Sequence, residues 1–89
     1  MERIHAVVSG LVQGVGFRYF VLDRAQTFGL GGWVRNRPDG SVEIEAEGET
    51  EALDAFLVTV RQGPRAAQVT GLRLERSVIS QKLNSFEVR

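Results

Sequence analysis

The sequence RIHAVVSGLVQGVGFRYF, residues 3–20, decides the first elements of the fold, because its hydrophobic pattern changes midway from the period of a strand to that of a helix. Ile4, Ala6 and Val8 alternate with other side chains, which predicts a strand over residues 3–10. After the glycines, aromatic and aliphatic residues recur at the three- and four-residue spacing of a helix. The stretch therefore predicts a strand, a glycine-rich loop and a helix in immediate succession.

The rest of the chain continues with strand-like and helix-like patterns. An Arg-Pro-Asp-Gly turn at residues 37–40 separates two strand-like runs and predicts a hairpin. Gly63 and Pro64 end a second helical pattern, and a slip of the apolar phase near Gly71 indicates a bulge in the following strand. The predicted strands cover residues 3–10, 33–36, 42–47, 69–76 and 86–88, and the predicted helices cover residues 17–28 and 49–62.

This βαββαβ order with a short last strand predicts an α+β fold of the ferredoxin-like, split βαβ type. Two helices would cover one face of an antiparallel sheet, with Phe17, Phe20 and Phe28 of the first helix in the core. Gly29 and the pair at residues 31–32 are expected to stop that helix. One layer of helices on one sheet can bury a core at this length, so we expect residues 1–89 to form a single domain.

The composition excludes several classes of function. Eleven basic residues balance eleven acidic ones, so no global field would recruit nucleic acid or an anionic membrane. There is no cysteine, which excludes disulfides, thiolate nucleophiles and cysteine metal sites. The N-terminal residues lack the apolar run of a signal peptide, and no stretch is long enough to span a bilayer. We expect a cytoplasmic monomer.

The glycine-rich loop is a candidate oxyanion site. Gly10, Gly14 and Gly16 permit positive φ angles that expose consecutive N–H groups, and the following helix adds the positive end of its dipole. Arg18 lies in the first helical turn, where a cation is unfavourable unless an anion lies beside it. The loop lacks the lysine of a Walker A motif, and Tyr19 stands where a dinucleotide fingerprint needs its third glycine. A simple tight turn is the alternative.

Two segments resemble the signatures of the acylphosphatase family. These are GLVQGVGFR at residues 10–18 and GWVRNRPDGSVE at residues 32–43, and the predicted order of elements also resembles that family's fold. The resemblance covers essentially the whole chain. It implies hydrolysis of the carboxyl–phosphate bond of small acyl phosphates, without metal or cofactor, with inorganic phosphate as product or competitive inhibitor.

The resemblance also implies roles for individual residues. Arg18 would hold the phosphate and Asn36 would position the attacking water. Because an asparagine cannot take up a proton at neutral pH, the substrate's own phosphate oxygen is the expected recipient. A turn asparagine that bonds the hairpin backbone is the alternative for Asn36. The residues expected to bind the phosphate are Gln13, Gly14, Val15, Gly16, Phe17 and Arg18.

A binding protein is the main rival class, because RNA-recognition modules share the βαββαβ order and present aromatic side chains on their middle strands. Here Glu43, Glu45 and Glu47 occupy that strand at period two and are interpreted as one solvated face, which would repel RNA. A small-ligand regulatory domain would not need the glycine-arginine loop. The only histidine, His5, lies in a strand and is interpreted as structural.

Overall fold

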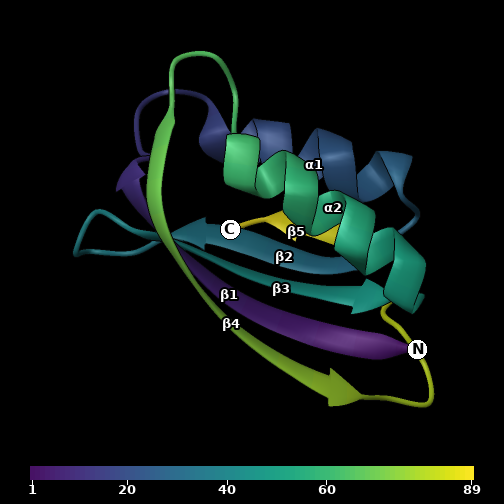
Figure 1. The fold of residues 1–89 in the computed structure, drawn as a ribbon. Helices are drawn as coiled ribbons and strands as arrows, with labels where there is room; N and C mark the ends of the chain where they lie inside the picture. Colours follow the sequence, from purple (N-terminus) through teal and green to yellow (C-terminus); the bar gives the residue numbers. More distant parts are fainter.

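Two helices lie on one face of a five-stranded sheet in the computed structural model, which describes residues 1–89 (Figure 1). The observed elements match the predicted ones to within two residues at either end. In chain order they are β1 (Glu2–Leu11), α1 (Phe17–Thr27), β2 (Gly31–Asn36), β3 (Val42–Gly48), α2 (Thr50–Gln62), β4 (Gln68–Val78) and β5 (Phe86–Val88).

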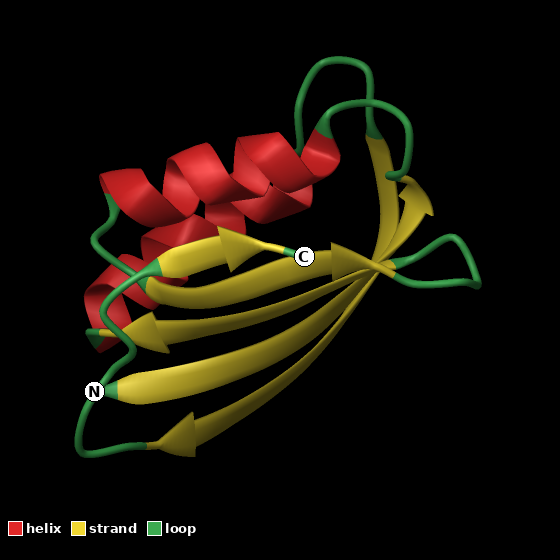
Figure 2. Cartoon of the chain, turned by 180° about the vertical axis from the view of Figure 1, so that it is seen from behind, coloured by secondary structure: helices red, strands yellow, loops and turns green.

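The strand order in the sheet is β4-β1-β3-β2-β5, which confirms the ferredoxin-like α+β fold. The three pairings among β1 to β4 are antiparallel, whereas β5 pairs in parallel with β2. The chain leaves β4 at one edge, crosses the end of the sheet through residues 79–85, and arrives at the other edge running alongside β2. Figure 2 shows the strands with both helices on one side and the second face uncovered. Only the last strand therefore departs from the antiparallel sheet that the sequence predicts.

One stripe of each helix packs against alternate residues of the strands to form a single cluster of 17 buried apolar residues. The buried stripe of α1 consists of Phe17, Val21 and Ala25, which are four residues apart and so share one face. Phe20 and Phe28, also predicted to be core residues, are partly buried and pack against this cluster. The buried stripe of α2 consists of Leu53, Phe56, Leu57 and Val60.

The predicted helix stop and bulge are both found, with one difference. Gly29 has a φ of 68°, and the next N–H, of Leu30, donates to the carbonyl of Ala25 at 2.9 Å, which ends α1 in a left-handed turn. Residues 31–32 belong instead to β2. The β1–β4 register shifts between Ser9, which faces Gly71, and the next residue, which confirms the bulge near that glycine.

The uncovered face of the sheet carries an ion-pair network, and the prediction of a solvated row of glutamates was wrong. Glu43 is 9% exposed and lies 2.6 Å from both His5 Nε2 and Arg35 Nε. Its hydrogen bond with His5, aided by Arg35 and opposed by burial, lowers the pKa of the Glu43 carboxyl. Glu47 is 2% exposed and accepts hydrogen bonds from Arg3 and from the backbone of Leu83. Arginines on the neighbouring strands and the connection before β5 thus cover Glu43 and Glu47, although their period-two spacing predicted that they would face solvent.

Candidate active site

The loop between β1 and α1 takes its shape from two glycines. Gly14 and Gly16 have φ angles of 75° and 76°, in the left-handed region that other residues rarely adopt. A Cβ atom on either would meet no atom within 4 Å, so backbone conformation rather than crowding requires glycine there. The loop can therefore turn its successive peptide groups outward.

The backbone N–H groups of residues 13–16 donate to no acceptor in the protein. The first hydrogen bond of α1 runs from Phe20 N to Gly16 O at 3.0 Å, and Gly16 caps the helix without a side chain. The N–H groups of the first turn consequently have no partner within the helix, and no acidic residue lies there to balance the dipole. Loop and helix end together form a positively polarised surface that favours an anion.

Arg18 is held beside this surface by Arg89, the residue that follows β5. Its Nη1 donates to the carbonyl oxygen of Arg89 at 3.1 Å, and Arg89 N donates in turn to Val34 O in β2 at 2.8 Å. A long-range contact of this kind leaves no local mark in the sequence. It fixes one side of the guanidinium fork and leaves its other N–H groups available to a ligand.

Asn36, at the end of β2, carries the one buried side-chain polar atom that lacks a hydrogen-bond partner, its Oδ1. An unsatisfied buried acceptor costs about 1–3 kcal/mol, which makes such atoms rare in native folds. The alternative prediction, a structural turn asparagine, would have used this oxygen to bond the hairpin backbone. The Oδ1 atom instead has no partner in the protein.

One small cavity brings these groups together. It has a volume of about 120 Å³ and is lined by both predicted catalytic residues, Arg18 and Asn36. Gln13 and Val15, two of the predicted phosphate-binding residues, are not among the residues that line it. The complete lining is Val12, Gly14, Gly16, Phe17, Arg18, Tyr19 and Asn36.

The side chain of Gln13 joins the loop to the hairpin between β2 and β3. Its Nε2 donates to the carbonyl oxygens of Arg37 and Ser41 at 2.8 and 2.9 Å. The hairpin turn is further held by Asp39, whose carboxylate accepts from the N–H and hydroxyl of Ser41 and has a lowered pKa for that reason. Since Asn36 directly precedes this turn, Gln13 connects the two halves of the cavity.

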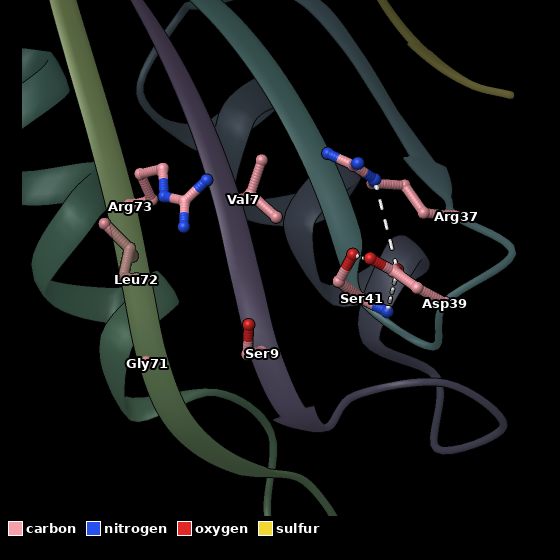
Figure 3. A pocket seen from close by; sticks show the side chains of 8 residues that line it. All are labelled: Val7, Ser9, Arg37, Asp39, Ser41, Gly71, Leu72 and Arg73. Carbon is pink, nitrogen blue, oxygen red and sulfur yellow. Dashed lines mark hydrogen bonds and ion pairs between the residues drawn. The ribbon is translucent and has the colours of Figure 1, made fainter.

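A larger hollow of about 370 Å³ lies on the uncovered face of the sheet (Figure 3). Arg37 and Arg73 extend toward it from the hairpin and from β4, on either side of Val7. It contains neither Arg18 nor Asn36 and none of the unpartnered N–H groups. The smaller cavity is therefore the candidate active site.

These features define an α+β domain of ferredoxin-like topology with a candidate oxyanion site at the turn between its first strand and first helix. A sequence model of the family Acylphosphatase matches residues 4–88. The chain is 46% identical over 88 residues to an acylphosphatase of Methylococcus capsulatus, covering 99% of this chain and 96% of the relative. It belongs to the acylphosphatase family.

Solved structures agree with this assignment. The crystal structure of acylphosphatase from Bacillus subtilis matches with a TM-score of 0.96 at 42% identity, over 100% of this chain and 99% of that one. An acylphosphatase structure from Coxiella burnetii matches with a TM-score of 0.90 at 38% identity, over 99% and 93% of the two chains. The chain is thus a hydrolase with acylphosphatase activity on small-molecule acyl phosphates. None of its helices is long and apolar enough to cross a membrane.

Proposed function

We propose that the enzyme cleaves the carboxyl–phosphate bond by direct attack of water on phosphorus, with Arg18 and Asn36 as catalytic residues. The observation that carries this proposal is that Arg18 and Asn36 line the same 120 Å³ cavity, where Asn36 has a buried Oδ1 without a partner in the protein. The N–H groups of residues 13–18 and the Arg18 guanidinium would bind the phosphoryl oxygens. Preorganised donors of this kind are worth about 3 kcal/mol each in the transition state.

In the proposed step a water oxygen forms a bond to phosphorus while the bond from phosphorus to the acyl oxygen breaks. The bonding electrons leave with the carboxylate, which needs no protonation. Asn36 Oδ1 accepts a hydrogen bond from the water and aims it, but an amide does not take up the proton at neutral pH. That proton passes to a phosphoryl oxygen of the substrate. The products are a carboxylate and inorganic phosphate.

This scheme needs no metal or cofactor, because the loop and Arg18 supply the charge stabilisation that phosphoryl transfer requires. Inorganic phosphate fits the same donors and would act as a competitive inhibitor. All of the groups involved come from one chain, so we propose that residues 1–89 act as a single, monomeric domain. A cytoplasmic location stays a prediction.

The test compares Asn36→Ala with Asn84→Ala, a matched change in the exposed connection before β5. With acetyl phosphate as substrate, Asn36→Ala should lower kcat by about a hundredfold to a thousandfold. Its inhibition constant for inorganic phosphate should stay at the wild-type value, as should both quantities in Asn84→Ala. Arg18→Ala should lose both turnover and phosphate affinity. Loss of phosphate affinity with turnover intact in Asn36→Ala would contradict the role given to this residue.

Hydrolysis in ¹⁸O-labelled water tests the site of attack. Attack on phosphorus places the label in inorganic phosphate, whereas attack on the carbonyl carbon places it in the carboxylate. Label in the carboxylate would overturn the proposed step whatever the variants show.

A further inference from the structure

The cavity that holds Arg18 and Asn36 is too small for an acyl phosphate with a bulky acyl group. Its volume is about 120 Å³. A water molecule takes up about 30 Å³ in the liquid, so the cavity has room for a phosphoryl group and one attacking water. Pockets that enclose drug-sized ligands have volumes of about 300–1,000 Å³. A bulky acyl group of a bound substrate must therefore lie outside the cavity, across its rim.

Only one residue of the lining has a side chain free to meet that acyl group. Two of the lining residues are glycines, and Val12 and Phe17 are each 1% exposed and belong to the core. Arg18 and Asn36 are taken by the phosphoryl group and the water in the mechanism above. Tyr19 remains.

Tyr19 is 65% exposed and lies in the first turn of α1, next to Arg18. It is the one aromatic residue among the exposed large apolar side chains. Its hydroxyl makes no hydrogen bond to the protein, and its ring pairs with no other aromatic ring, since the ring pair of this helix is Phe17 with Phe20. Nothing in the fold thus uses this ring.

We propose that Tyr19 determines specificity for the acyl group, and that its ring packs against the acyl portion of the substrate. Aromatic rings favour offset or edge-to-face contact with other rings and cover apolar groups well. The substrate class that fits is an acyl phosphate with an aromatic or bulky apolar acyl group, rather than a small one such as acetyl. This inference rests on the proposed function, because the acyl group is located from the position of the phosphoryl group.

The test measures kcat/KM for benzoyl phosphate and for acetyl phosphate in the wild type and in Tyr19→Ala and Tyr19→Phe. Loss of the ring should lower the benzoyl-to-acetyl ratio of kcat/KM by about fivefold, the typical worth of an aromatic pair. Tyr19→Phe keeps the ring and should keep the wild-type ratio. Val58→Ala removes an exposed apolar side chain from α2, outside the cavity, and serves as the control. The benzoyl-to-acetyl ratio of Val58→Ala should equal that of the wild type. The inhibition constant for inorganic phosphate should be unchanged in all three variants.

An equal loss with both substrates in Tyr19→Ala, or a weaker inhibition by phosphate, would overturn the inference, because Tyr19 would then support the loop. A Tyr19→Phe ratio as low as that of Tyr19→Ala would overturn it too, since the hydroxyl and not the ring would carry the effect. The proposed function fails separately, if Asn36→Ala keeps its turnover. The ratio measured in the Tyr19 variants does not depend on that result.

Discussion

Replacing Gln13 by alanine should loosen the connection between the loop and the β2–β3 hairpin. The substitution removes the two hydrogen bonds from Gln13 Nε2, at 2.8 Å to Arg37 O and 2.9 Å to Ser41 O. Neither carbonyl is left without a donor, because Arg37 O also accepts from Gly40 N at 3.1 Å and Ser41 O from Arg37 N at 2.8 Å. The cost is therefore the ordinary net value of about 1 kcal/mol per bond, or about 2 kcal/mol of unfolding free energy.

A loss of this size should lower the Tm by about 8–16 °C in a domain of this length. It should also reduce kcat, because the hairpin would no longer hold Asn36 in register with the loop. Displacement of a reacting group by about 1 Å can cost a hundredfold in rate. Thermal unfolding followed by circular dichroism gives the first quantity, and hydrolysis of acetyl phosphate gives the second. Gln26→Ala, an exposed glutamine on α1, is the matched control.

Three results would refute this reasoning in different ways. A Tm and a kcat equal to those of the control would mean that Gln13 joins nothing. A lower Tm with unchanged kcat would mean that the hairpin does not position the site. A weaker inhibition by phosphate, with Tm and kcat unchanged, would mean that the Gln13 side chain binds the phosphate directly.

Two further predictions concern the loop and the uncovered face of the sheet. Gly16→Ala should cost about 1–2 kcal/mol of unfolding free energy, because its φ of 76° is strained for alanine although the Cβ meets nothing, and should weaken phosphate inhibition. Urea unfolding and inhibition assays measure the two effects. Unchanged phosphate inhibition would mean that the backbone of Gly16 does not contribute to phosphate binding. Hydrogen bonding from His5 and Arg35 lowers the pKa of Glu43, so this carboxylate stabilises the fold above its unfolded pKa and loses that effect as the pH falls through its folded pKa. Between about pH 6 and pH 3, the free energy of unfolding measured in urea should fall less steeply with decreasing pH in Glu43→Gln than in the wild type. An equally steep fall would mean that Glu43 does not cause the loss of stability in acid.

Local patterns in the sequence predicted most of the fold. The change of period within residues 3–20 and the Pro-Asp-Gly turn placed the first strand, the first helix and the hairpin, because backbone preferences and side-chain alternation act over a few residues. The parallel pairing of β5 was not predictable in this way. A three-residue strand carries no signal for its partner, which depends on the course of residues 79–85 across the sheet.

Some features of the candidate site were likewise predictable from local sequence, and others were not. The glycines and Arg18 mark an oxyanion loop locally, and the two family signatures single out Asn36 as its partner. Tyr19 was read only as the residue that breaks a dinucleotide fingerprint, since a lone aromatic in a helical pattern does not reveal its exposure. The glutamates of β3 were placed in solvent for a similar reason, because period two says which face a side chain takes but not what covers that face.

The sequence by itself determined the order of elements, the glycines that expose the loop N–H groups, and the residue types that can hold a phosphoryl group and position a water. These follow from φ preferences and side-chain chemistry, which each residue carries alone. Only the tertiary structure decided that the Oδ1 of Asn36 is buried without a partner, that Gln13 joins loop to hairpin, and that Arg89 O holds Arg18. Burial and long-range hydrogen bonds arise when strands far apart in the chain become neighbours, so no local pattern encodes them.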